Sequence, residues 1–85
     1  MQKDYENILK KQIIYRCSYT GTKETDLLFK KLILKKIHQF DKLDLSNILE
    51  IFQNYSDHEI FLLLTNVQKP TKKYIKIINK IKNEK

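Results

Sequence analysis

The sequence predicts an all-α protein, a compact five-helix bundle made of a single domain. Its 85 residues match the size of one small domain. Apolar residues recur along the whole chain at the i, i+3, i+4, i+7 spacing of helices. One glycine and one proline interrupt this pattern, and hydrophobic residues make up 41% of the chain, enough for a core. We therefore treat residues 1–85 as one helical domain.

The first two helices are expected over residues 4–17 and 22–38. On the first, the residues expected to face the core are Tyr5, Ile8, Leu9, Ile13 and Cys17. On the second, they are Leu28, Phe29, Leu32, Ile33 and Ile37, with Leu27 and Leu34 widening the stripe. Between the helices, Gly21 suits the left-handed position that follows a helix C-terminus. Glu24 and Asp26 fall in the first turns of the second helix, where carboxylates favour the helix dipole.

The third and fourth helices follow with clearer boundaries. The third is expected over residues 44–54, and its buried residues are Leu45, Ile48, Leu49 and Phe52. Ser56 and Glu59 form a capping box that begins the fourth helix, and Tyr55 and Ile60 occupy the two positions of a hydrophobic staple. The buried face of the fourth helix is expected to comprise Ile60, Leu63, Leu64 and Val67.

The fifth helix is expected over residues 71–82, within a basic C-terminal segment of residues 72–85. Pro70 ends the fourth helix or opens the fifth, because proline fits a first turn and not a helix interior. The inward residues are Tyr74, Ile77, Ile78 and Ile81, and the outward ones are Lys72, Lys73, Lys76 and Lys80.

The net charge of +7 favours an acidic partner, such as nucleic acid, anionic lipid or an acidic protein. The same charge is also typical of a lysine-rich, solvated surface. No window contains the roughly 18 apolar residues of a membrane span, and the first residues lack the apolar region of a signal peptide. A single cysteine suits a reducing compartment. We therefore expect a cytosolic protein without a membrane segment.

Sites for catalysis are not indicated. His38 and His58 lie far apart in sequence and match no zinc-site spacing. Cys17 falls on an apolar helix face, where a small buried thiol is expected. One glycine cannot build a phosphate-binding loop. We expect neither an enzyme nor a metal site.

The corner between the first two helices, residues 16–26, has the composition of a binding surface. Around Gly21 it gathers hydrogen-bonding side chains, one arginine and an exposed tyrosine, and the last two residue types commonly anchor protein interfaces. The residues that we expect to bind a partner are Arg16, Tyr19, Thr20, Gly21, Thr22, Lys23, Glu24 and Asp26.

The order of residues at this corner resembles the bacterial and mitochondrial succinate dehydrogenase assembly factor family, whose hallmark is Arg-Gly-x-x-Glu between the first two helices. The matching residues here are Tyr15-Arg16, Gly21, Lys23-Glu24 and Asp26-Leu27-Leu28. Downstream, the matching residues are Leu49-Glu50, Asp57-x-Glu59-Ile60-Phe61, Leu63-Leu64 and Pro70. Two positions depart from the family pattern. Thr20 stands in place of the motif arginine, and Leu63 stands where tryptophan is frequent.

The resemblance implies a non-enzymatic helper of five helices. It would bind the flavoprotein subunit of succinate dehydrogenase, or of fumarate reductase, and promote covalent attachment of FAD to it. By the same resemblance, FAD belongs to the client and is not stably held by this chain, and the protein would be a monomer of the bacterial cytoplasm. Two alternatives remain from the residues themselves: a basic helical protein that binds nucleic acid through its lysine face, and another helical interaction module.

Overall fold

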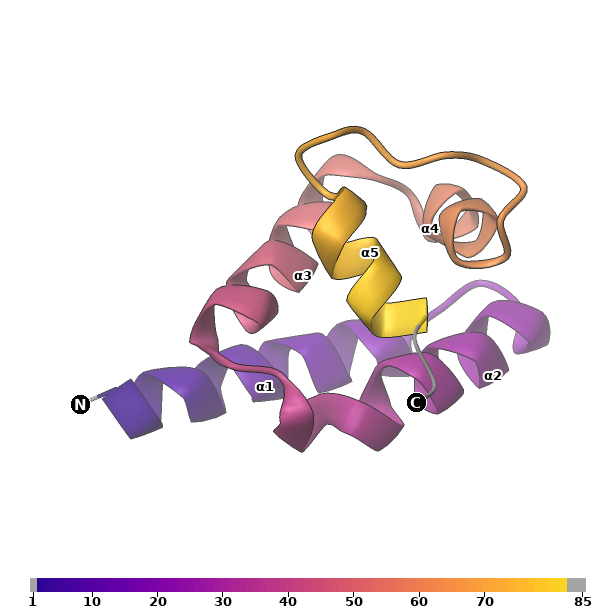
Figure 1. Ribbon diagram of the computed structural model, residues 1–85. Helices are drawn as coiled ribbons and strands as arrows, with labels where there is room; N and C mark the ends of the chain where they lie inside the picture. Colours follow the sequence, from indigo (N-terminus) through magenta and orange to yellow (C-terminus); the bar gives the residue numbers. More distant parts are fainter. Residues whose placement is uncertain (1, 83–85) are drawn as a thin grey trace.

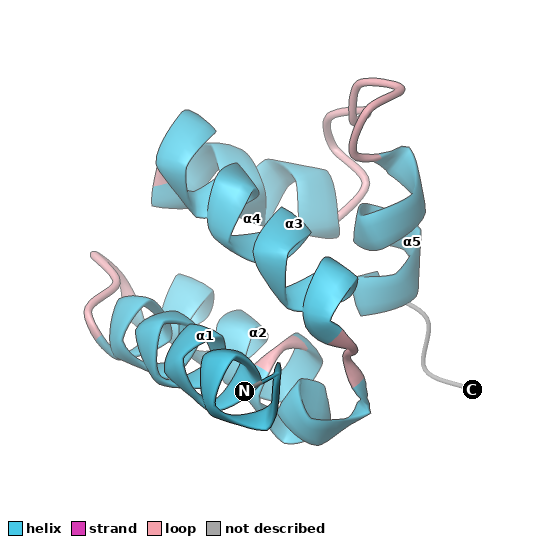
Figure 2. Cartoon of the chain, turned by 90° about the vertical axis from the view of Figure 1, so that its left-hand side faces the viewer, coloured by secondary structure: helices cyan, strands magenta, loops and turns pink. Residues whose placement is uncertain are grey.

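The helices of the protein form two layers, which Figures 1 and 2 show from perpendicular directions. The computed structural model describes residues 2–82, with side chains from residue 5 onward. The elements are α1 (Gln2–Ser18), α2 (Lys23–Leu32), the 3-10 helix η1 (Leu34–Gln39), α3 (Lys42–Asn54), α4 (Asp57–Leu64) and α5 (Ile75–Lys82). One layer holds α1, α2 and η1, and α3, α4 and α5 lie on it. Over the described residues the prediction of an all-α, five-helix domain is confirmed.

The core lies between the layers and takes residues from every helix. Ile13, Phe29, Leu45, Ile60 and Ile78 are all almost completely buried. Each belongs to a stripe predicted from helical spacing, so most of the predicted core is confirmed. Helix α1 packs on α3, and α2 on α4, and these contacts hold the corner between α1 and α2 near the start of α4.

Four residues predicted to be buried are exposed instead. They are Tyr5, Ile8, Leu27 and Val67, with exposed fractions of 46%, 52%, 65% and 72%. On α1 the buried stripe consists of Leu9, Ile13 and Cys17; Ile8 lies beside this stripe, and Tyr5 continues it toward the N-terminus, beyond its buried part. The two other residues lie on the solvent side of α2 and beyond the end of α4.

The single helix predicted over residues 22–38 is two elements. Helix α2 ends at Leu32, where the Ile33 N–H still donates to the Phe29 carbonyl at 2.8 Å, and η1 follows. A 3-10 helix has three residues per turn, so residues three apart share a face. This repeat aligns Leu34 with Ile37 and Phe40, the last two of which are buried. The change of period therefore keeps apolar residues directed at the core up to the turn into α3.

Side-chain caps set the ends of α3 and α4. Helix α3 begins two residues earlier than predicted because Asp41 and Asp44 form a capping box that the sequence analysis missed. The predicted box at α4 is confirmed. The Ser56 hydroxyl accepts from the Glu59 N–H at 3.2 Å, and Glu59 Oε1 accepts from the Ser56 N–H at 2.9 Å.

Helix α4 ends in a reversal that exposes Val67. Asn66 adopts a left-handed backbone with φ of 68°, and the Val67 N–H donates to the Leu62 carbonyl at 3.0 Å. This is the bonding of a Schellman motif, in which asparagine can take the place of glycine. The chain therefore leaves the helix before Val67 can turn toward the core.

The connection between α4 and α5 spans residues 65–74, and Pro70 lies within it. Pro70 therefore neither ends α4 nor opens α5, which begins at Ile75, four residues later than predicted. The predicted inward residues of this segment are confirmed as buried: Tyr74, Ile77, Ile78 and Ile81. Residues 83–85 of the predicted basic segment lie outside the described residues.

Candidate partner-binding site

Threonine side chains order the corner between α1 and α2. Thr22 is the N-cap of α2: its Oγ1 accepts from the Thr25 N–H at 3.2 Å and donates to the Thr25 hydroxyl at 2.9 Å. The Thr20 hydroxyl donates to the Thr22 carbonyl at 3.2 Å. These bonds satisfy the first turn of α2 locally. The corner is therefore held by its own short side chains.

Gly21 does not have the left-handed backbone predicted for it, and that interpretation was wrong. No glycine of the described chain has a positive φ, and α1 ends without such a residue. A Cβ atom placed on Gly21 would meet no other heavy atom within 4 Å. Neither the backbone nor the packing of this chain therefore requires glycine at this position. The open space over Gly21 faces outward, where a partner could approach the backbone closely.

Arg16 lies away from the tip of the corner and joins three helices. Its Nη2 donates to Asp57 Oδ1 of α4 at 2.9 Å, in an ion pair whose side chains are 35% and 23% exposed. Its guanidinium carbon lies 5.0 Å from the centroid of the Phe52 ring on α3. The ion pair and the cation–π contact fix the end of α1 against α3 and α4.

The other predicted residues surround Gly21 on the surface. Tyr19 is 67% exposed and lies against Tyr15, with ring centroids 4.7 Å apart. Lys23 and Glu24 are exposed in the first turn of α2, and Asp26 forms an ion pair with Lys30 at 3.2 Å. The placement of Glu24 and Asp26 near the N-terminus of α2 is confirmed. In the described structure Glu24 caps nothing, since that role belongs to Thr22.

Two surface depressions meet at Gly21 and Thr22. One, of about 390 Å³, is lined by Ser18, Thr20, Gly21, Thr22, Lys23, Asp26 and Lys30. The other, of about 410 Å³, is lined by Gly21, Thr22, Glu24, Thr25, Asp57, His58 and Phe61. Arg16 and Tyr19 line neither. The structure thus brings six of the eight predicted residues together around two hollows, and Gly21 and Thr22 form the ridge that the hollows share.

Besides Thr25, the sequence analysis missed the three residues that α4 contributes to the second hollow: Asp57, His58 and Phe61. Spacing along the chain cannot reveal them, because only the packing of α2 on α4 brings them to the corner. The available signal is the segment from Asp57 to Phe61, which carries part of the family resemblance but is not among the predicted site residues.

Chemically, the site offers hydrogen bonds and mixed charge. Burial raises the pKa of the Cys17 thiol to about 12, so this thiol behind the corner stays protonated near neutral pH. Among the described residues, no group of three His, Cys, Asp or Glu side chains is placed to hold a metal ion. No described helix has the length and apolar character needed to cross a membrane.

Part of the predicted lysine face stabilises the fold. Lys73, in the α4–α5 connection, forms an ion pair with Glu50 of α3 at 3.0 Å, and Lys80 of α5 forms one with Asp44 of α3. Glu50 also accepts from the Tyr74 hydroxyl at 2.8 Å. The Lys73 ammonium, and after it this Tyr74 bond, lower the pKa of Glu50 below its usual value. Two of the four outward lysines are therefore partly neutralised, which weakens the case for a nucleic-acid surface here.

Comparison with known proteins identifies one family. A family model described as "flavinator of succinate dehydrogenase" matches residues 11–85. The match includes the corner, both hollows and every helix after the first turns of α1. No curated protein and no solved structure matches the chain.

Proposed function

The chain belongs to the flavinator of succinate dehydrogenase family, and we propose that it binds the flavoprotein subunit of succinate dehydrogenase and promotes covalent attachment of FAD to that subunit. The family resemblance seen in the sequence is thereby confirmed, and the family is one of assembly factors. What we propose beyond family membership is the contact with the flavoprotein subunit and the residues that make it.

One observation supports the corner as the contact surface. The two segments that carry the resemblance, around Gly21 and around Asp57, are distant in sequence yet line one hollow. Gly21 stands at its edge with open space above its backbone, although nothing within the chain requires glycine there. Both features are expected of a surface shaped for a partner.

In this proposal the protein contributes positioning. The flavin carries the reactive chemistry, and the histidine that receives it belongs to the client. A rigid bundle bound at the corner would hold the client so that histidine and flavin meet in reacting geometry. The Gly21 ridge would approach the client backbone, and Glu24 would accept hydrogen bonds from it. The surrounding contacts would come from Arg16, Tyr19, Thr20, Thr22, Lys23 and Asp26.

We further propose that the protein acts as a monomer in the cytoplasm and that FAD is held by the client. The single, buried Cys17 is compatible with a reducing compartment. Either the succinate dehydrogenase or the fumarate reductase subunit has the chemistry that such a helper would serve. The two can be compared directly in the experiment below.

The test is co-expression of the cognate flavoprotein subunit with and without this chain, with covalent flavin read from in-gel fluorescence. We expect strong fluorescence with the wild-type chain and a marked loss without it. Glu24→Ala is expected to lower the signal, whereas the matched control Glu6→Ala on α1, outside both hollows, should not. Equal covalent flavin in the presence and absence of the chain would refute the proposed function.

A further inference from the structure

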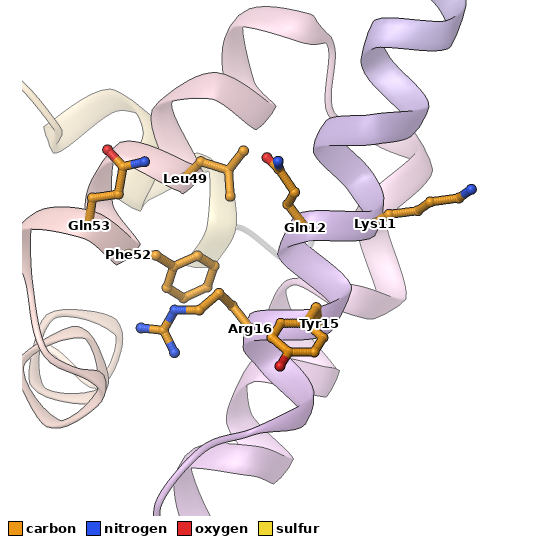
Figure 3. A pocket seen from close by; sticks show the side chains of 7 residues that line it. All are labelled: Lys11, Gln12, Tyr15, Arg16, Leu49, Phe52 and Gln53. Carbon is orange, nitrogen blue, oxygen red and sulfur yellow. The ribbon is translucent and has the colours of Figure 1, made fainter.

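A third surface hollow lies between α1 and α3, apart from the two at the corner. We call it the α1–α3 groove. It has a volume of about 460 Å³ and is lined by Lys11, Gln12, Tyr15, Arg16, Leu49, Phe52 and Gln53. Figure 3 shows Leu49, Phe52 and Gln53 on α3 opposite Gln12 and Arg16 on α1, with the Lys11 side chain pointing away from Phe52.

We propose that the α1–α3 groove is a second docking site, which binds a segment of the client flavoprotein carrying a carboxylate beside an apolar side chain. The inference rests on the proposed function for the identity of the client. It goes further in naming a different surface and the chemistry of the segment that this surface recognises.

Arg16 would bind the carboxylate. A guanidinium has five N–H donors, and the described structure gives this one a single hydrogen bond, from Nη2 to Asp57. Its side chain remains 35% exposed at the groove. Contacts with Asp57 and Phe52 already hold the guanidinium in place, so little side-chain entropy would be lost when a second carboxylate binds.

The rest of the lining suits a peptide segment with an apolar side chain. Leu49 and Phe52 supply an apolar wall, and the amides of Gln12 and Gln53 can donate and accept hydrogen bonds to a peptide backbone. Among the described residues, no acidic side chain lines the groove. Tyr15 is 64% exposed and touches Tyr19, so the groove is continuous with the corner surface.

Other occupants fit less well. A nucleic-acid strand needs several cations along its phosphates, whereas the groove has Arg16 and Lys11, and Lys11 points outward. A second copy of this chain would bring another net charge of +7 to a cationic surface. An acidic segment of a different protein meets neither difficulty.

The proposal is tested first in the complex, by calorimetry of the full chain with the cognate flavoprotein subunit. Gln53→Glu adds a negative charge to the groove while every corner residue and both members of the Arg16–Asp57 pair keep their side chains. We expect it to weaken binding by about tenfold, as a like-charge contact at an interface should. The matched control Gln68→Glu, in the α4–α5 connection, should leave affinity unchanged. If Gln53→Glu binds within about twofold of wild type, the groove is not a docking site.

A second experiment does not depend on the client. The full chain, isotope-labelled, is titrated with a capped tripeptide of two glutamates and one phenylalanine and followed by NMR. We expect saturable shifts at the Arg16, Gln12 and Gln53 side-chain N–H groups. A tripeptide with lysines in place of glutamates, and inorganic phosphate alone, should produce much smaller shifts.

The two experiments separate the possible failures. Equal covalent flavin with and without the chain, together with groove shifts in the NMR titration, would overturn the proposed function and leave the groove as an acidic-peptide site. Equal shifts with phosphate or with the lysine tripeptide would overturn the groove proposal and leave the corner untouched. Concentration-dependent dimers with the groove buried would show that a second copy is the occupant and would also overturn it.

Discussion

Replacement of Gly21 by alanine tests whether the fold or the binding of a partner requires glycine at this position. The described backbone at Gly21 is not left-handed, and an added Cβ meets nothing within 4 Å. Alanine can therefore take up this conformation without strain. Where that holds, Gly→Ala stabilises a protein by about 0.4–1 kcal/mol because the unfolded chain loses conformational freedom.

For a domain of this size, 1 kcal/mol moves Tm by roughly 4–8 °C. We therefore expect Gly21→Ala to raise Tm by about 2–8 °C, measured by thermal denaturation followed with circular dichroism. Urea denaturation should give the same sign. Binding to the flavoprotein subunit, measured by calorimetry on the same sample, should weaken, because the methyl group occupies the space that we assign to the partner.

A series of increasing size provides the internal control. Gly21→Ala, Gly21→Ser and Gly21→Val should all fold, while affinity for the client falls with the volume of the side chain. A loss of more than about 1 kcal/mol of folding stability in Gly21→Ala would show that the fold itself needs glycine, since it exceeds the gain expected from chain entropy. Unchanged affinity across the series would remove Gly21 from the contact surface.

Two further variants test the corner and the residue behind it. Thr20→Arg restores the side chain typical of the family and removes only one exposed hydrogen bond, to Thr22. The affinity for the client, measured by calorimetry, should therefore rise or stay the same. A large loss of affinity would show that the client surface is matched to threonine. In the folded state the Cys17 thiol has a pKa of about 12, compared with 9.0 for an ordinary cysteine. As pH rises above 9.0, the thiol of the unfolded state loses its proton while that of the folded state keeps it. The free energy of unfolding should therefore fall between pH 9.0 and pH 12. Urea denaturation at about pH 8 and pH 10 should show a larger loss for wild type than for Cys17→Ala, and equal losses would contradict the assignment.

Helical spacing predicted most of the core because a helix on a layer must bury one face. Helical spacing failed at residues whose exposure depends on which neighbouring helices cover them and not on their position in the helical repeat. Ile8 lies beside the stripe of α1 that packs on the other helices, and Tyr5 lies on the same face as that stripe but beyond its buried part. The same limit applies to Leu27. A periodic pattern indicates which residues share a face and does not state how wide a face the neighbouring helices cover.

Helix ends were predictable where a side chain provides the cap. Ser56 and Glu59 marked the start of α4 correctly, and Asp41 with Asp44 would have marked α3 by the same rule. The change from α-helix to 3-10 helix after Leu32 has no comparable signal, because it is imposed by the turn toward α3. The left-handed position predicted for Gly21 is found in the described chain at Asn66 instead, after α4. Asparagine can take this conformation as well as glycine, so the presence of glycine alone did not locate it.

The candidate site was also predictable only in part. The grouping of residues at the corner could be predicted from the sequence because they lie within one short segment. The hollow opposite and the α1–α3 groove could not, since each joins two helices that only tertiary packing brings together.

The Arg16–Asp57 ion pair connects the two proposed surfaces. Arg16 lines the α1–α3 groove, and Asp57 lines the hollow beside Gly21 and Glu24. A client carboxylate at Arg16 would share the guanidinium with Asp57 and weaken the existing bond. Asp57 would then accept hydrogen bonds from a client segment in the corner hollow more readily. Occupation of the groove should therefore favour binding at the corner, and substitutions in the two surfaces should show non-additive effects on client affinity.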